Sequence, residues 1–245
     1  MPSPRKRLGL LAGLTVVATA TVSVLLSTGA VAAPAGTQGQ DVSSYQGSVN
    51  WQAQWNAGSR FAYIKATEGT YYTNADFAQQ YNGSYNVGMI RGAYHFARPD
   101  TTSGATQADY FVAHGGGWSK DGKTLPGALD IEYNPYGAEC YGLSQASMRT
   151  WITSFSNEYH AKTTRWPVLY TTTDWWNTCI GNYNAWSANS PLWIARYSST
   201  VGALPPGYTV YSFWQWSSAA TLAGDSDVWN GTLDRLKVLA CNGTC

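Results

Sequence analysis

The chain has 245 residues, of which 12% are charged, and its formal net charge at pH 7 is +1. Nucleic acids and anionic membrane surfaces select clustered positive charge, so this balance argues against either as a partner. The 12 Trp and 17 Tyr suit stacking against sugar faces, even if packing within strands accounts for more than half of these rings.

The N-terminus has the features of a secretory signal peptide. Basic residues at 5–7 precede an apolar run over 8–28 and small residues at 30–33. An uncleaved anchor is the alternative, because the run is nearly long enough to span a bilayer. Its Gly, Thr and Ser content favours cleavage, which predicts a secreted, extracellular protein with no membrane partner after export. We therefore expect a signal peptide over 1–33, a short linker over 34–39, and one domain over 40–245 with a Cys-containing tail.

Short apolar strands alternate with helical segments along the rest of the chain. Asn74 and Ser144 are expected to cap two of the helices. Such alternation predicts a parallel α/β sheet, and eight strand candidates suggest a closed barrel with fewer helices in its second half. The expected strands are 40–43, 61–67, 89–97, 127–133, 167–172, 192–197, 210–216 and 227–229, and the expected helices are 74–85, 103–114, 144–161 and 232–239.

Two carboxylates lie two residues apart at the end of the expected strand 127–133. Residues i and i+2 of a strand share a face, so Asp130 and Glu132 should project together while Leu129 and Ile131 pack on the other side. Clustered carboxylates hold a proton more tightly, which creates an acid and a base at the same pH. Glycoside cleavage needs such a pair, although a charged strand end facing solvent would look the same in sequence.

The four cysteines of an exported chain are expected to form disulfides, and three pairings are possible. Cys140 and Cys179 follow neighbouring strands of the expected sheet, which favours Cys140–Cys179 and leaves Cys241 to pair with Cys245. The three histidines have neither a nucleophile setting nor metal-binding spacing. We therefore expect no catalytic cysteine, no metal site and no cofactor.

Several ordered motifs resemble glycoside hydrolase family 25, the Chalaropsis-type lysozymes. The resemblance spans about residues 40–239, and its joint order and spacing carry more weight than any one motif. The motifs are DVSSYQG at 41–47, FAYIKATEG at 61–69, GAYHF at 92–96, LDIE at 129–132, LWIARY at 192–197 and FWQW at 213–216.

The resemblance implies a single TIM-like barrel of the (β/α)5(β)3 kind, with irregular later units. It also implies a monomeric muramidase that hydrolyses the β-1,4 bond between N-acetylmuramic acid and N-acetylglucosamine in bacterial peptidoglycan. The family's acid maps onto Glu132, and its other carboxylates map onto Asp130, Asp41 and a late Asp227. Asp225 stays an alternative for the last, because Asp227-Val-Trp-Asn departs from the family's D-L-N by one inserted aromatic residue.

Five further side chains at or near strand ends are expected to line a sugar groove. Barrel packing is the alternative for the aromatic members of this set. Lys65 and Glu68 are expected to pair with each other, without a role in binding or catalysis. The five groove candidates are Tyr63, Tyr94, Tyr170, Trp214 and Gln215.

Three other functions compete with this interpretation. A catalytically silent wall-binding protein would not need the carboxylates at 41, 130 and 132. A peptidoglycan amidase would need a zinc triad, which the scattered histidines do not offer. A chitinase would more often carry a D-x-x-D-x-D-x-E run, which is absent.

Overall fold

The computed structural model describes residues 32–219 and 221–245. Nearly all of the expected signal peptide therefore lies outside the described residues. Within them, none of the helices combines the length and apolar character that crossing a bilayer requires.

The described chain forms one closed barrel. Its strands pair in parallel from β1 round to β8, and β9 closes the ring by pairing antiparallel with both β8 and β1. A short strand, β3 (Tyr72–Thr73), forms a hairpin with β2 outside the ring. The barrel strands are β1 (Thr37–Val42), β2 (Phe61–Glu68), β4 (Ile90–Phe96), β5 (Ala128–Asp130), β6 (Val168–Thr171), β7 (Leu192–Ala195), β8 (Phe213–Ser217) and β9 (Asp225–Trp229).

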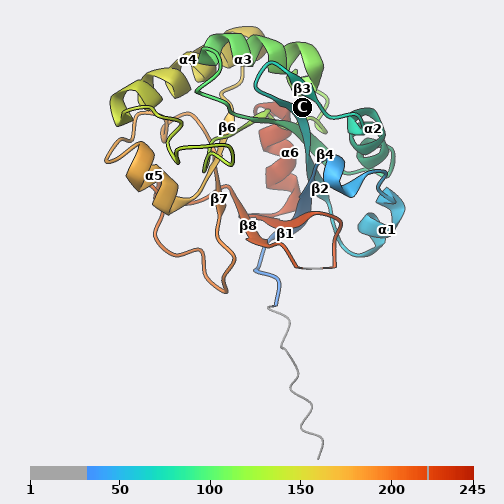
Figure 1. The fold of residues 1–245 in the computed structure, drawn as a ribbon. Helices are drawn as coiled ribbons and strands as arrows, with labels where there is room; N and C mark the ends of the chain where they lie inside the picture. The colour runs from blue at the N-terminus through green and yellow to red at the C-terminus, as the bar shows by residue number, and fades with distance from the viewer. Residues whose placement is uncertain (1–31, 220) are drawn as a thin grey trace, which may run out of the picture. The chain divides into compact units, whose positions relative to one another are not determined.

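Helices cover the outside of the first part of the barrel (Figure 1). One helix follows each of the first five barrel strands, and none follows β7 or β8. This arrangement confirms the expected (β/α)5(β)3 barrel. The segment from β7 to β8 contains Pro205-Pro206-Gly207, which disfavours a regular helix there. The five helices are α1 (Trp51–Asn56), α2 (Phe77–Asn86), α3 (Gly104–Phe111), α4 (Gln145–Thr163) and α5 (Thr173–Cys179).

The sequence missed two of these helices and misplaced one cap. Neither α1 nor α5 was expected, because each has only two turns or fewer and lacks a clear apolar period. Asn74 does not cap α2, which begins three residues later. Its side chain instead accepts from the Asp76 amide at 2.9 Å and donates to the Lys65 carbonyl at 2.8 Å, so it organises the preceding turn.

The longest helix, α4, buries an apolar stripe in the core of the domain. Ser144 caps it by accepting from the Ser147 amide at 3.2 Å, which confirms the expected N-cap. The stripe formed by Met148, Ile152 and Phe155 is fully buried. Gly104 lets α3 approach closely, because a Cβ there would lie 2.2 Å from the carbonyl oxygen of α4's Trp151.

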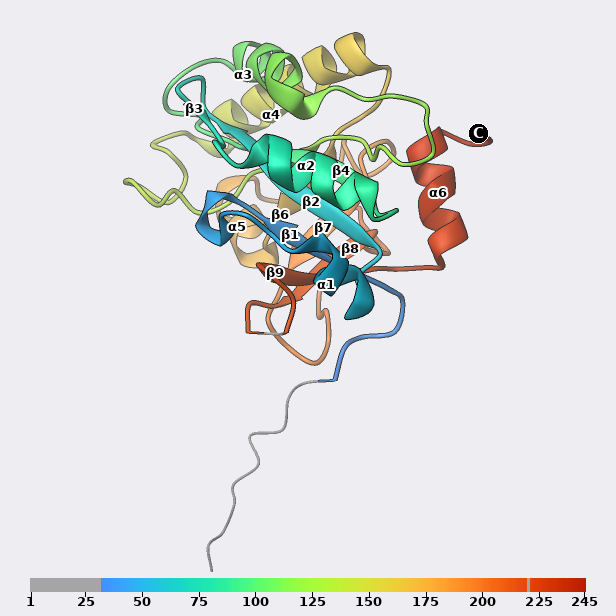
Figure 2. The ribbon, with the colours of Figure 1, turned by 90° about the vertical axis from the view of Figure 1, so that its right-hand side faces the viewer.

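A final helix, α6 (Leu233–Cys241), closes one end of the barrel. Figure 2 shows it beside the ends of the strands, away from the outer helices. Leu236 and Ala240 pack against residues at the starts of the strands, such as Phe61 and Ile90. The helix therefore seals the amino-terminal end of the barrel and leaves only the carboxyl end open.

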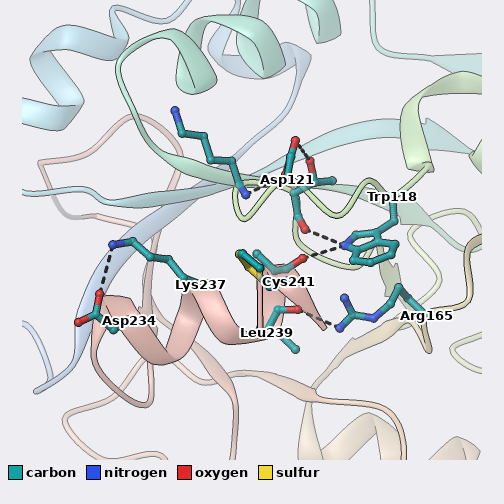
Figure 3. The surroundings of a disulfide bond; sticks show 11 residues. Trp118, Asp121, Arg165, Asp234, Lys237, Leu239 and Cys241 are labelled. Atoms are coloured by element: carbon teal, nitrogen blue, oxygen red, sulfur yellow. Dashed lines mark hydrogen bonds and ion pairs between the residues drawn. A yellow bond between two sulfur atoms is a disulfide. The ribbon is translucent and has the colours of Figure 1, made fainter. Parts of the chain in front are cut away.

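The C-terminal carbonyls of α6 are held by side chains from elsewhere in the chain (Figure 3). Trp118 Nε1 donates to the Ala240 carbonyl at 3.1 Å, and Arg165 donates to the Leu239 carbonyl at 2.9 Å. These bonds satisfy acceptors that a helix end leaves unpaired. The Cys241–Cys245 disulfide follows, and Cys140–Cys179 ties the loop after β5 to α5, so both expected pairings are confirmed.

We expect Leu236→Ala to lower the free energy of unfolding by about 2–4 kcal/mol, since it empties a fully buried site between α6 and the barrel. Val238→Ala, on the exposed side of the same helix, is the matched control and should change it by less than about 0.5 kcal/mol. Denaturant-unfolding curves measure both values. Equal losses would contradict the sealing role of α6.

Candidate active site

A cavity of about 340 Å³ opens at the carboxyl ends of the barrel strands. Barrel enzymes place their chemistry at this end, because the loops that follow the strands meet there. Four carboxyl groups line the cavity, and three of them are buried or nearly so. They belong to Asp41, Asp130, Glu132 and Asp225.

The strand after α3 presents its two carboxylates as expected. Although β5 ends at Asp130, the Ile131 amide still donates to the Tyr170 carbonyl at 3.0 Å, so the extended pairing continues. Asp130 and Glu132 therefore face the cavity together, while Leu129 and Ile131 are fully buried in the layer beneath the helices.

The last strand brings Asp225, rather than Asp227, to the cavity. Because β9 runs antiparallel to β1, its earlier residues lie nearer the open end, and Asp225 pairs with Asp41 in register. Asp227 lies one layer deeper, opposite Gly39, where it is fully buried and accepts from Trp193 Nε1 at 2.8 Å. The sequence allowed either residue to be the late carboxylate of the site. The antiparallel direction of β9 places Asp225 at the cavity and Asp227 below it.

Burial governs the protonation of this cluster. It raises the pKa of Glu132 to about 7, an effect that the Lys65 charge opposes and Asp225 reinforces. Burial, followed by repulsion from Glu132, raises the pKa of Asp130 well above its ordinary value. Burial and then Asp225 raise the pKa of Asp41. At mildly acidic pH the cavity therefore holds a protonated carboxylic acid, which is what a general acid requires.

Gln215 is the polar anchor of the cavity floor. Its Nε2 donates to Asp41 Oδ2 at 2.7 Å, and its Oε1 accepts from the hydroxyls of Tyr170 at 2.9 Å and Tyr197 at 3.0 Å. Neutral donors thus orient Asp41 without a cation. Tyr197, which also donates to Asp225 at 3.3 Å, was not expected from the sequence.

Two of the five expected groove residues do not line the cavity. Tyr63 is fully buried below it and donates to the Pro126 carbonyl at 3.0 Å. Trp214 lies outside the barrel wall, with Nε1 donating to the Arg196 carbonyl at 2.8 Å. Trp214 and Gln215 are strand neighbours, so only one of them can face inward. The structure places Tyr94, Tyr170 and Gln215 at the cavity as expected.

The cavity also has lining residues that the sequence motifs do not predict as site residues. Trp193 lines the cavity, and alternation along β7 could have placed it inward, because Leu192 and Ile194 belong to the outer layer. Lys65 also lines the cavity, although no role was assigned to it.

Two smaller hollows flank the central cavity and share residues with it. One, of about 250 Å³, includes Glu132, Tyr170 and Tyr197. The other, of about 190 Å³, includes Lys65 and Tyr45. The carboxyl groups therefore lie in the central cavity, and each smaller hollow adjoins it through shared residues.

The described part of the chain offers no metal centre: no three of its His, Cys, Asp or Glu residues are grouped to hold an ion. His95 is fully buried, and both of its ring nitrogens are already engaged, by Thr67 Oγ1 at 2.7 Å and by Gln107 Oε1 at 2.9 Å.

Comparison with known proteins agrees with this geometry. The family model described as glycosyl hydrolases family 25 matches residues 40–225. The chain belongs to glycosyl hydrolase family 25. It is therefore a glycoside hydrolase, as its motifs indicate.

Relatives in this family match most of the barrel domain. The chain is 53% identical to the N,O-diacetylmuramidase of Chalaropsis sp., over 83% of this chain and 98% of the relative. It is 52% identical to Lysozyme M1 of Streptomyces globisporus, over 84% of this chain and 72% of the relative. The solved structure of a muramidase from Acremonium alcalophilum is 55% identical, covers 84% of this chain and 99% of its own, and has a TM-score of 0.82.

We expect Tyr63→Phe to lower the free energy of unfolding by about 0.5–1.5 kcal/mol, because a buried hydrogen bond is lost, without lowering hydrolytic turnover. Tyr94→Phe removes a hydroxyl from the cavity lining and is the matched variant, in which turnover should fall. Denaturant unfolding and initial rates measure the two effects. If Tyr63→Phe lost turnover at normal stability, Tyr63 would have a role in the active site after all.

Proposed function

We propose that this chain is a secreted lysozyme that hydrolyses the β-1,4 bond between N-acetylmuramic acid and N-acetylglucosamine in bacterial peptidoglycan. Membership of glycosyl hydrolase family 25 and the muramidase and lysozyme names of its relatives support the substrate. The observation that carries the proposal is the carboxyl pair of Asp130 and Glu132 in the cavity, with the Glu132 pKa raised to about 7.

Glu132 serves as the general acid in this proposal. Its carboxyl stays protonated below about pH 7 and can protonate the glycosidic oxygen as the bond to the sugar breaks. The proton is therefore available at mildly acidic pH and is lost as the pH rises through that value. A wall-binding protein without activity would have no use for a carboxyl held in this state.

Asp130 orients the substrate's own nucleophile. Asp130 lines the cavity beside Glu132, and its Oδ1 has no hydrogen-bond partner among residues 32–219 and 221–245. A 2-acetamido group of a bound sugar, held by Asp130, can attack its own anomeric carbon. Asp41, anchored by Gln215, and Asp225 are the other two carboxyl groups of the cavity and lie beside the bound sugar in this proposal.

The reducing ends released from purified peptidoglycan test the proposed bond. Muramic acid at the new reducing ends supports a muramidase, whereas glucosamine ends would show a glucosaminidase. Release of peptides without reducing sugar would point to an amidase.

We further propose that residues 1–33 are a signal peptide, that 34–39 form a linker before a single domain over 40–245, and that the protein works outside the cell as a monomer. The basic, apolar and small-residue pattern before position 34 supports export.

We expect Glu132→Gln to fold normally and to lose cell-wall lysis by at least about a hundredfold, because general-acid assistance is typically worth 10²–10⁴. Glu139→Gln, the same change at an exposed position of the same loop, is the control and should keep full activity. Initial lysis rates and thermal unfolding of both variants check this. Near-full turnover in Glu132→Gln would mean that another group is the acid.

We expect hydrolysis with net retention of configuration, because attack by the acetamido group and then by water inverts the anomeric carbon twice. Proton NMR of the first product should show the β-anomer before mutarotation. An initial α-anomer would overturn the assisted mechanism and leave room for a directly attacking water.

A further inference from the structure

A lysine stands in the cavity where the general acid must keep its proton. The Lys65 side chain, from β2, is only 15% exposed and lines the central cavity together with Asp130 and Glu132. A nearby cation favours the ionised form of a carboxyl group. An unpaired Lys65 would therefore lower the pKa of Glu132 and favour loss of the proton that Glu132 has to donate.

Glu68 pairs with this lysine at the edge of the cavity. Lys65 Nζ lies 2.7 Å from Glu68 Oε2, and within the described residues no other carboxylate lies within 4.0 Å of it. The ammonium also lies 4.8 Å from the centre of the Phe96 ring and 5.3 Å from that of Tyr72. Lys65 and Glu68 together line the side hollow, so the pair marks the boundary between the two spaces.

Glu68 is itself fixed in place as a carboxylate. Its second oxygen accepts from the hydroxyls of Tyr71 at 2.8 Å and Tyr136 at 2.6 Å. Arg98 holds Tyr71 in turn, by donating to its hydroxyl at 2.6 Å. Burial opposes ionisation, but the bonds from Lys65, Tyr136 and Tyr71 hold the pKa of Glu68 below its ordinary value.

We propose that Glu68 is a positioning residue of this active site, which keeps the Lys65 charge paired so that Glu132 retains its proton. The proposal rests on the proposed function, since only a general acid needs this protection. Glu68 does not touch the reacting atoms. It acts through Lys65, because the two paired side chains together carry no net charge.

The groups that face Glu132 come from most of the barrel strands. Apart from Lys65, none of these residues is replaced in the variants below, so a displaced pH profile reports the Lys65–Glu68 pair. The carboxyl groups among them belong to Asp41, Asp130 and Asp225, the hydroxyls to Tyr94, Tyr170 and Tyr197, and the cations to Lys65 and Arg196.

The alkaline limb of the kcat/KM profile tests this proposal, because it reports the loss of the acid's proton. Glu68→Gln keeps the size of the side chain and leaves Lys65 as a net positive charge. The midpoint of the alkaline limb should therefore shift to lower pH by at least about half a unit. Lys65→Met removes the cation, and the midpoint of the alkaline limb should shift to higher pH. The double variant carries neither charge and should return toward the wild-type profile.

Tyr71→Phe is the matched control, because it removes one hydrogen bond to the same carboxylate without changing any charge. Its limb should stay in place. A limb displaced as far as in Glu68→Gln would show that Glu68 acts through the loops and not through Lys65. The proposal is also overturned if Glu68→Gln leaves the limb unmoved, or if the double variant behaves like Glu68→Gln.

A titration that does not depend on activity separates this proposal from the proposed function. Carbon NMR of protein labelled at the glutamate carboxyls, assigned with Glu132→Gln, follows the Glu132 pKa in each folded variant. A Glu132 pKa that falls in Glu68→Gln and rises in Lys65→Met supports the proposal, even if the reducing ends released from peptidoglycan are not muramic acid. Muramic acid ends with a stationary Glu132 pKa would refute it and leave the proposed function standing.

Discussion

The burial of several carboxyl groups in one barrel mouth is the constraint on which the rest of the structure depends. Burial raises the pKa values of Asp41, Asp130 and Glu132, and of Asp227 beneath them. Between the ordinary carboxyl pKa near 4 and these raised values, the folded state binds more protons than the unfolded state. Stability from these groups is therefore present at low pH and falls as the pH rises through the raised pKa values. The barrel layers and the α6 seal must offset that loss near neutral pH.

Neutral hydrogen-bond donors offset part of the cost of burying these carboxyl groups. Gln215 donates a hydrogen bond to Asp41, and Trp193 donates one to Asp227. The Tyr197 hydroxyl donates to Asp225. Neutral donors stabilise charge locally without the long-range field of a cation, which would also ionise the acid. Burial still outweighs these hydrogen bonds, so the pKa values of Asp41 and Asp227 stay raised. The donors fix the orientation of the carboxyl groups without adding a positive charge beside Glu132.

Sequence predicted the features that depend on local periodicity. The strand order, the shared face of Asp130 and Glu132, and the Cys140–Cys179 bridge all follow from patterns within one or two neighbouring elements. Depth in the barrel does not follow, because it depends on how strands tilt and stagger against each other. Tyr63 shares a face with Lys65 but lies one layer deeper, and Asp225 reaches the mouth only because β9 runs against its neighbours. Trp214 could have been excluded, since the inward Gln215 beside it fixes its direction.

The seal formed by α6 also decides where other modules can be joined to this domain. β1 starts, at Thr37, at the end of the barrel that α6 covers, and the last helix ends on that same face. Figure 2 shows both on the side of the molecule away from the loops that follow the strands. A wall-anchoring module or a surface-display partner fused at either end would therefore join the barrel on the side opposite the cavity and leave the cavity open.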